Sequence, residues 1–356
     1  MKIFIDGRGM GEGATGGGKA LRYLLRQLRT DFPRHDYVTC DPAGASSWRL
    51  ARQLVWEQIE LPLRALRLGA DVVHQPGGAP GPLASPVKVV MTVHDLAPTR
   101  HPELLPHARS RWYWGRMVPR AARRAHAVLV PSAATKRDVV ALAGVPEGRV
   151  HVAPWGVPLD VTAGAPGATR AGLSDTYGLP DAYVLYVGTI DRRKDYRTLL
   201  AAVARLEPGL QLVIAGTIIA GRTDFLETVA ALGLGPRVRV LGYVPERDLP
   251  PLYRGAAAFV YPSFYEGFGL PVIEAMACGT PVVTYRTTSL PEVAGDAALL
   301  LDPPVSPEAL AAALTRVVHD QALRGQLVER GLARAAHFDW RRTAEVTASV
   351  YEGLAG

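Results

Sequence analysis

Two glutamates, Glu266 and Glu274, lie eight positions apart around the loop Gly267-Phe268-Gly269-Leu270. Residues 259–261 before the loop end an apolar run typical of a strand, and Pro271 suits the first turn of a helix. Free N–H groups and the positive end of the helix dipole make the start of a helix favourable for phosphate. The pattern therefore predicts a site for a sugar that carries a diphosphate, with a carboxylate at each end of the turn.

A second group of charged residues follows the apolar run at 183–188. Arg192, Arg193 and Lys194 are three consecutive cations in the loop that opens there. Ligands of parallel α/β sheets bind outside the carboxyl ends of the strands, so these cations should face the ligand. Fixed cations act most strongly on charge that develops as a leaving group departs. The loop therefore predicts cations that face the ligand-binding cleft, and the alternative is a helix-capping loop with solvated charges.

Polar residues also follow a predicted strand in the amino-terminal half. His94 and Asp95 come directly after the apolar residues 87–93. A polar pair in that place should line the cleft, and Asp95 would orient His94 or cap the next segment. Gly17 and Gly18 follow a long glycine-rich loop, and we expect a helix to begin near Lys19.

Apolar runs alternate with helical patterns along the chain. Strands are predicted at 3–5, 37–39, 72–74, 87–93, 127–130 and 150–152, and again at 183–188, 211–215, 238–241, 257–261, 281–284 and 298–301. Between the two series, residues 161–180 are rich in Gly, Ala and Thr, and we place a linker there. The predicted fold class is α/β, with two tandem doubly wound Rossmann-like domains and the active site in the cleft between them.

The motif around the two glutamates resembles that of retaining glycosyltransferases of family 4. The preceding Tyr-Pro-Ser and the following Glu-Ala-Met-Ala-Cys-Gly-Thr-Pro-Val-Val agree with that family. The resemblance implies the GT-B fold, with an acceptor-side domain at 1–165, a nucleotide-sugar-binding domain at 166–338 and a last helix, 339–356, that returns to the first domain. It also implies a metal-independent hexosyltransferase, and the chain contains no Asp-x-Asp tripeptide.

The resemblance assigns a role to each candidate residue. Glu274 would bind the ribose of the nucleotide, and Glu266 would lie near the transferred sugar. The implied catalytic set is His94, Arg193, Lys194 and Glu266. The implied donor-binding set is Gly17, Gly18, Tyr243, Val244, Gly267, Phe268, Gly269, Leu270 and Glu274. Many members carry arginine directly after the glycine where this chain has Thr189, so Arg192 is the alternative to Arg193.

The predicted co-substrate is a nucleotide-diphosphate sugar, and no cofactor or metal is expected. The Gly-Thr-Ile variant of the cationic loop looks most like mannosyltransferases, which favours GDP-mannose, with a UDP-sugar as the alternative. The acceptor would be a glycan, a lipid-linked molecule or a small molecule, as in polysaccharide biosynthesis. No nucleic acid partner is expected.

The formal charge of +7 and the pI of about 9.5 favour an acidic partner. The densest basic tract, residues 109–124, interleaves arginines with aromatic residues, which suits contact with an anionic membrane or a solvated helix face. Two cysteines are too few for a disulfide framework. The first residues resemble a strand rather than a secretory signal, so we expect a cytoplasmic protein, with peripheral contact at the inner membrane face as an option.

Two other functions stay open at this point. Gly9 and Gly11 after a strand, with Asp41 after the next apolar run, imitate the fingerprint of an NAD-dependent oxidoreductase, although a dinucleotide turn should enter its helix at once. That interpretation also leaves Glu266 and Glu274 unexplained. A non-catalytic protein that binds a nucleotide sugar would share every binding residue with the transferase.

Overall fold

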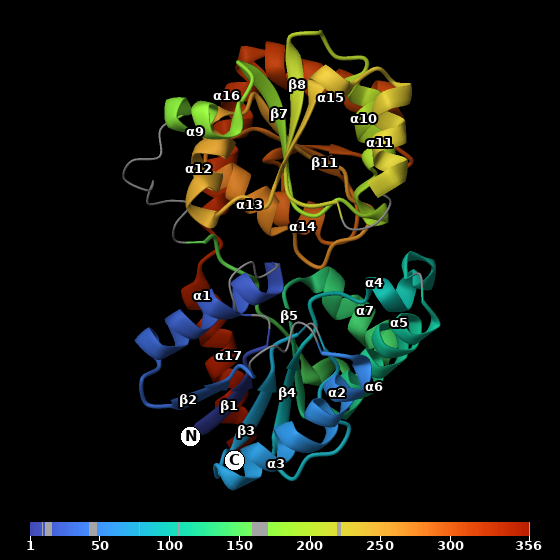
Figure 1. Ribbon diagram of the computed structural model, residues 1–356. Helices are drawn as coiled ribbons and strands as arrows, with labels where there is room; N and C mark the ends of the chain where they lie inside the picture. The colour runs from blue at the N-terminus through green and yellow to red at the C-terminus, as the bar shows by residue number, and fades with distance from the viewer. Residues whose placement is uncertain are drawn as a thin grey trace. The chain divides into compact units, whose positions relative to one another are not determined.

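The computed structural model describes residues 1–8, 10, 16–42, 48–77, 79–105, 107–158, 170–218 and 222–355. The chain divides into two compact units, Met1–Gly156 with Asp339–Gly356, and Val157–Phe338. Each unit contains a six-stranded sheet with helices packed on it (Figure 1). All neighbouring strands pair in parallel, which confirms the predicted α/β class of two Rossmann-like domains.

The sheet of the first unit has the strand order β2-β1-β3-β4-β5-β6. Its strands are β1 (Lys2–Asp6), β2 (Asp36–Cys40), β3 (Val72–Gln75), β4 (Lys88–Thr92), β5 (Ala127–Val130) and β6 (Val150–Val152). Residues such as Ile3, Val72 and Val90 are fully buried, because helices cover both faces of a parallel sheet. The order of the strands reverses between β1 and β3, where ligands of such folds bind.

The helices of the first unit include two long ones that contain π-helical segments. These are α2 (Leu50–Val55), η2 (Trp56–Glu60) and α3 (Leu61–Arg67), and then α5 (Ala108–Trp112), η4 (Tyr113–Met117) and α6 (Val118–Arg124). The others are α1 (Gly16–Asp31), α4 (Ala97–Arg100), η3 (Pro102–Leu104), α7 (Ala133–Ala143), η5 (Glu147–Arg149) and α17 (Trp340–Ala355). Helix α7 has clear end signals, since Ser132 caps its start and Gly144 ends it at φ 66°.

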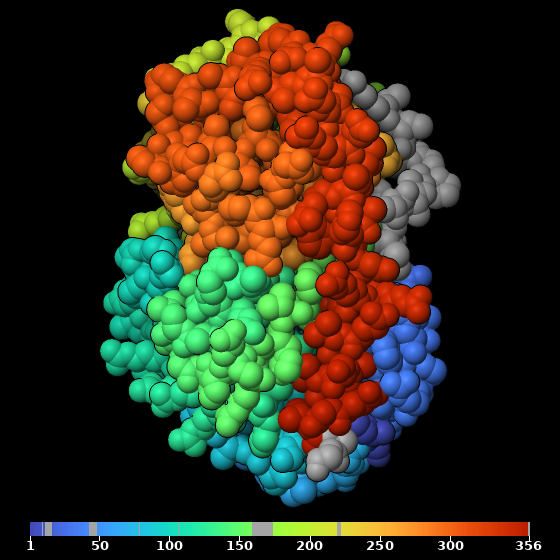
Figure 2. Space-filling model, turned by 180° about the vertical axis from the view of Figure 1, so that it is seen from behind, coloured from blue at the N-terminus to red at the C-terminus, as the bar shows by residue number. Residues whose placement is uncertain are grey.

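Helix α17 belongs to the core of the first unit although it ends the chain. Trp340 stacks on Tyr23 of α1 at 5.6 Å between ring centroids, and Tyr351 is fully buried. In Figure 2 the red surface of α17 runs between the blue surface of α1 and the green segment that contains α7. The last helix thus supplies large apolar side chains to this unit.

The sheet of the second unit has the order β12-β11-β10-β7-β8-β9. Its strands are β7 (Ala182–Val187), β8 (Leu210–Ala215), β9 (Val238–Gly242), β10 (Ala258–Tyr261), β11 (Val282–Tyr285) and β12 (Ala298–Leu301). The order reverses between β7 and β10, which pair directly. The loops that follow these two strands therefore lie side by side at the expected ligand-binding edge.

Helices cover both faces of the second sheet, with α10 and α11 on one side and α12 and α13 on the other in Figure 1. The helical segments of this unit are α9 (Arg170–Tyr177), η6 (Arg192–Lys194), α10 (Tyr196–Val203), α11 (Arg222–Ala231), η7 (Gly235–Arg237), η8 (Glu246–Asp248), α12 (Leu249–Gly255), α13 (Leu270–Ala277), α14 (Leu290–Ala294), α15 (Pro307–His319) and α16 (Gln321–Ala335). Ser306 and Asp320 cap the starts of α15 and α16. No helix of the described chain is long and apolar enough to cross a membrane.

One helix start differs from the prediction, and some residues used in the sequence analysis lie outside the described part of the chain. Helix α1 begins at Gly16, three residues before the start expected near Lys19. Gly9 and Gly11, on which the dinucleotide alternative depends, lie outside the described residues, and so does most of the first half of the expected linker at 161–180.

Candidate functional site

The loops after β7 and β10 join at the reversal point of the second sheet. The backbone N–H of Phe264 donates to the carbonyl of Arg193 at 2.8 Å, and the Ser263 hydroxyl lies 3.4 Å from the same oxygen. Because β7 and β10 are neighbours, these contacts bring the cationic loop against the glutamate loop. Lys194 and Glu266, which are 72 positions apart in sequence, thereby come together.

A buried ion pair forms the centre of this region. The Lys194 ammonium donates to Oε1 of Glu266, and it donates to the hydroxyl of Tyr261 at 2.8 Å. Ser263 donates to the same carboxylate oxygen at 2.6 Å. Burial alone would lower the pKa of Lys194, but the Glu266 carboxylate outweighs it and the pKa is raised. The lysine therefore stays charged and provides a fixed cation at the ligand-binding edge.

The two arginines of the cationic loop have different surroundings. Asp191 caps the loop by accepting from the backbone N–H of Arg193 at 2.8 Å. Its carboxylate also pairs with the Arg193 guanidinium at 3.1 Å, and that side chain is 28% exposed. Arg192 is exposed. The charge of Arg193 is thus partly neutralised by Asp191, whereas Lys194 forms an ion pair with Glu266.

Hydrogen bonds with residues 288 and 289 fix the backbone of the glycine loop. No role for these two residues was predicted from the sequence. The Ser289 hydroxyl donates to the carbonyls of Glu266 and Phe268 at 3.0 and 2.8 Å. The backbone N–H of Glu266 donates to Thr288 at 2.9 Å. Gly269 precedes α13 at φ 108°, a conformation that favours glycine, and Gly267 and Leu270 are buried around it. Helix α13 therefore begins at the loop, with the positive end of its dipole beside it, although Pro271 has no N–H and the N–H of Val272 donates to the carbonyl of Gly269 at 2.9 Å.

Glu274 lies one turn further along α13 and has a different partner. Its side chain is buried, and its Oε2 accepts from the hydroxyl of Tyr253 on α12 at 2.8 Å. Tyr243 and Val244 follow β9, the edge strand two positions from β7. Tyr243 is 58% exposed and Val244 is 6% exposed. The two glutamates thus take separate positions, one against Lys194 and one inside the helical layer.

His94 is the centre of the candidate site in the first unit. Its Nε2 lies 2.8 Å from the carbonyl of Pro76, which can only accept, so this nitrogen carries the proton in the neutral ring. Burial lowers the pKa of His94, against smaller opposing effects of Pro76 and Asp95. The imidazole is therefore neutral at pH 7. Asp95 caps the next segment by accepting from the N–H of Ala97 at 2.9 Å.

Two glycines make room for this imidazole. A Cβ on Gly17 would lie 2.2 Å from Cε1 of His94, and a Cβ on Gly77 would lie 2.1 Å from Nε2. Trp155 contacts the ring edge to face, with centroids 5.1 Å apart. Gly17 and Gly18 occupy the first turn of α1, so the start of this helix lies against His94. Gly77 was missed because nothing in the sequence around it marks a close approach.

The structure does not test the expectation that catalysis needs no metal. Among the described residues no group of three or more His, Cys, Asp and Glu side chains is arranged to hold a metal ion. The positive charges that could meet a diphosphate are those of Lys194 and Arg193 and the positive end of the α13 dipole.

Comparison with known proteins defines the class to which this fold and site belong. Residues 19–161 match the family described as Glycosyltransferase Family 4, and residues 177–334 match Glycosyl transferases group 1. HepE of Anabaena, solved in complex with UDP and glucose, has a TM-score of 0.76 at 20% identity, covering 99% of this chain and 100% of that chain. WaaG, a glycosyltransferase involved in lipopolysaccharide biosynthesis, has a TM-score of 0.75 at 17% identity over 99% and 100% of the two chains. These likenesses define the fold as GT-B.

Relatives that are similar in sequence show the family to which the chain belongs. O-antigen chain mannosyltransferase B of Escherichia coli is 35% identical over 272 residues, which are 75% of this chain and 71% of that protein. D-inositol 3-phosphate glycosyltransferase of Mycobacterium tuberculosis is 31% identical over 319 residues, which are 81% of this chain and 65% of that protein. The chain belongs to the family 4 glycosyltransferases.

Proposed function

We propose that the chain is a retaining mannosyltransferase that transfers mannose from GDP-mannose to an acceptor hydroxyl. The observation that carries the proposal is the Lys194–Glu266 pair, which sets a fixed cation beside the glycine loop at the reversal point of the second sheet. The likeness to O-antigen chain mannosyltransferase B supports mannose. The UDP and glucose bound by HepE keep a UDP-sugar as the alternative donor.

The proposed reaction exchanges one bond at the sugar carbon. The acceptor oxygen forms a bond to C1 on the face from which the nucleoside diphosphate leaves, and the C1–O bond to phosphate breaks. The acceptor proton passes to a phosphate oxygen of the leaving group. Lys194, Arg193 and the positive end of the α13 dipole stabilise the charge that grows on the diphosphate. Glu266 stabilises the positive character of the sugar.

Other residues of the second unit would hold the donor without taking part in the bond change. Glu274 would bind the ribose hydroxyls, and the backbone of Tyr243 and Val244 would meet the base. The loop Gly267-Phe268-Gly269-Leu270 would hold the phosphates and the sugar. We assign donor binding to the unit Val157–Phe338 and acceptor binding to the other unit.

His94 would bind the transferred sugar from the first unit, with Gly17 and Gly18 beside it. Its neutral ring has the proton on Nε2, and that proton is engaged by Pro76. Nδ1 is therefore the nitrogen that can accept from a sugar hydroxyl. The acceptor would be a glycan, a lipid-linked molecule or a small molecule.

We also propose that the enzyme works without an essential metal and contacts anionic membrane. The cations named above would offset the diphosphate charge in place of a metal. Six arginines of the tract 109–124 are exposed, and no Asp or Glu occurs between residues 104 and 137 to balance them. Trp112 in the same tract is 40% exposed. This combination suits anionic headgroups at a membrane surface.

A donor panel tests the main proposal. GDP should raise the midpoint of thermal unfolding, because a ligand at a hundred times its Kd adds about 2.7 kcal/mol. UDP and ADP should do so less, and NAD should not. Mannosyl transfer with GDP-mannose should then persist in EDTA, and NMR of the product should show the retained anomer. Stabilisation by NAD alone, an inverted product, or tight GDP-mannose binding without any turnover would each contradict the proposal.

A further inference from the structure

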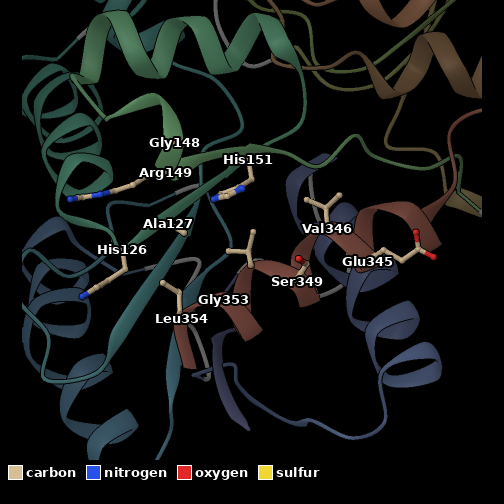
Figure 3. A pocket seen from close by; sticks show the side chains of 11 residues that line it. His126, Ala127, Gly148, Arg149, His151, Glu345, Val346, Ser349, Gly353 and Leu354 are labelled. Carbon is tan, nitrogen blue, oxygen red and sulfur yellow. The ribbon is translucent and has the colours of Figure 1, made fainter. Parts of the chain in front are cut away.

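A pocket of about 480 Å³ lies in the first unit between α17 and the strands β5 and β6 (Figure 3). His126, Gly148 and Arg149 line it from the residues that precede the two strands. These are the amino ends of parallel strands, whereas His94 follows the carboxyl end of β4. The pocket therefore lies at the opposite edge of the sheet from the site proposed for catalysis.

The two walls of this pocket have different chemistry. The strand wall carries basic groups, and the helix wall, formed by α17, is apolar apart from the Ser349 hydroxyl and the Glu345 carboxylate at the rim. Figure 3 shows the side chain of His151 and those of the α17 residues on facing sides of the hollow. The basic groups are His126, Arg149 and His151, and the helix residues are Glu345, Val346, Ser349, Val350, Gly353 and Leu354.

Burial and nearby positive charge disfavour the protonated forms of the two imidazoles in the basic wall. Burial and then the nearby charges of Lys88 and Arg149 lower the pKa of His126. Burial and then Lys136 lower the pKa of His151. An anion that entered the pocket would relieve this repulsion and would raise the pKa of both imidazoles.

The carboxylates near the pocket are engaged elsewhere. Glu345 lies at the rim on α17 and pairs with Arg341 of the same helix at 3.3 Å. Glu147 pairs with Lys136 at 3.4 Å. Arg149 is exposed at the mouth. The positive charge of Arg149 is therefore available to a ligand.

His126 has a defined tautomer when neutral. Its Nδ1 lies 3.0 Å from the backbone N–H of Val89, which can only donate, so the ring proton is on Nε2. The ring thus presents a donor on the side away from the sheet backbone. A phosphoryl oxygen can accept from such a donor and from a guanidinium at the same time.

We propose that this pocket binds an organic phosphate, a phosphomonoester whose small apolar body packs on α17. Arg149, His126 and His151 take the phosphoryl group, and Val346, Val350 and Leu354 contact the apolar part. The volume lies within the range of about 300–1,000 Å³ that small-molecule sites occupy, which is more than a bare phosphate needs. Nothing in the proposed transfer reaction requires this second anion site.

Occupancy of the pocket would affect a helix that reaches the catalytic side of the same sheet. The hydroxyl of Tyr351 lies 2.6 Å from Nδ1 of His74, and Nε2 of His74 lies 2.8 Å from the Thr92 hydroxyl. Tyr351 follows Val350 directly and faces the sheet rather than the pocket. A ligand against α17 would therefore favour the docked position of this helix and stabilise the unit.

The test is a titration of the full chain, labelled with ¹⁵N-histidine and followed by NMR. Phenyl phosphate should shift the His126 and His151 signals saturably, more tightly than inorganic phosphate, and phenol should have no effect. Binding should tighten as the pH falls from 8 to 6, because protonated imidazoles attract the anion. The pKa of both histidines should rise when phenyl phosphate is bound.

Variants distinguish this pocket from general anion binding. Arg149→Gln should weaken phenyl phosphate at least tenfold, and Ser349→Leu, which fills the pocket from α17, should weaken it similarly. Arg26→Gln, the same change on an exposed position of α1, should leave the affinity unchanged. Equal binding by wild type and Arg149→Gln, or shifts of the two histidines that do not saturate, would overturn the proposal. These readouts do not depend on transferase activity.

Discussion

Glu266 and Glu274 share one short motif but meet different partners. The Glu266 carboxylate accepts from Lys194 and Ser263 beside the glycine loop, where charge would develop during transfer. Glu274 is buried on α13 and accepts from Tyr253. A residue beside the reacting sugar acts in the transition state, whereas a ribose ligand acts equally in both states.

The first prediction separates these two roles. Glu274→Gln should mainly raise KM for the donor and weaken donor titration, because it removes binding common to ground and transition states. Glu266→Gln should lower kcat by at least tenfold with little change in donor affinity. Steady-state kinetics and calorimetric titration measure both, with Glu329→Gln on the exposed side of α16 as the control.

Glu266→Gln also leaves the Lys194 ammonium without its counterion, so its unfolding midpoint has to be measured beside its kinetics. A folded Glu266→Gln enzyme with wild-type kcat would contradict the assigned role. Equal effects of both variants on kcat and on affinity would contradict the division of roles.

The second prediction concerns the space around His94. Gly17→Ala should displace the imidazole, since the new methyl group would lie 2.2 Å from Cε1. We expect kcat to fall at least tenfold while GDP affinity, which we assign to the second unit, stays the same. Gly325→Ala within α16 is the matched control, because no atom lies within 4 Å of its added methyl group.

Alanine in the interior of a helix is favoured over glycine by about 1 kcal/mol, so Gly325→Ala should slightly stabilise the protein. If Gly17→Ala retained wild-type kcat, His94 would not need its present position for turnover.

At the scale of elements, the strands were predictable and the π-helical segments were not. Runs such as 183–188 are apolar throughout because both faces of the sheet are covered, and each predicted strand lies within two residues of an observed one. The π-helical segments η2 and η4 meet through the hydroxyl of Tyr113, which donates to Glu57 at 2.5 Å. That contact joins residues 56 positions apart, and a local pattern carries no information about it.

The same limit applies to the candidate site. Lys194 was recognisable because it follows an apolar strand, and Glu266 and Glu274 because they flank a glycine loop at the start of a helix; both patterns are local. Gly77 and Ser289 were missed, because their roles come from the approach of His94 and of the glycine loop in space.

The third prediction concerns α5, η4 and α6 as one element. The chain should bind vesicles that contain phosphatidylserine at low salt, and binding should fall steeply as salt screens the charges. Replacing Arg109, Arg111 and Arg116 together by Gln should weaken binding at least tenfold, because each basic residue near such a surface contributes about 1 kcal/mol.

The control for the third prediction has the same loss of charge elsewhere. The triple variant Arg26→Gln, Arg137→Gln, Arg316→Gln replaces three exposed arginines outside the tract and should bind like wild type. Equal loss in both triple variants would indicate a response to net charge alone, and no binding at low salt would remove the membrane proposal.

At the scale of the whole molecule, stability depends on a histidine buried between the sheet and the last helix. Burial lowers the pKa of His74 to about 3. The unfolded chain, with an ordinary value near 6.5, binds the proton first, so stability falls as the pH drops below 6.5. Burial raises the pKa of Glu57 to about 7, which acts in the opposite direction between pH 7 and 4.5.

The fourth prediction therefore compares wild type with His74→Gln, since Glu57 contributes equally to both. Between pH 7.5 and 5.5 the wild type should lose about 1.4 kcal/mol more of its unfolding free energy than the variant. Urea unfolding at both pH values measures the difference, with circular dichroism as the check on folding. Parallel losses in the two proteins would show that the pKa of His74 in the folded protein is not lowered from its value in the unfolded chain.

The position of α17 in the first unit has a consequence for synthesis of the chain. A ribosome that makes about 5–20 residues each second delivers Val157–Phe338 complete before Trp340 appears. Until then Tyr23 of α1 lacks the ring that stacks on it, and His74 lacks Tyr351. The inserted unit can therefore finish folding during translation, while the first-made unit waits for α17. A premature stop before Trp340 would leave an apolar surface of the first unit open to chaperones, because the partners of Tyr23 and His74 would be missing.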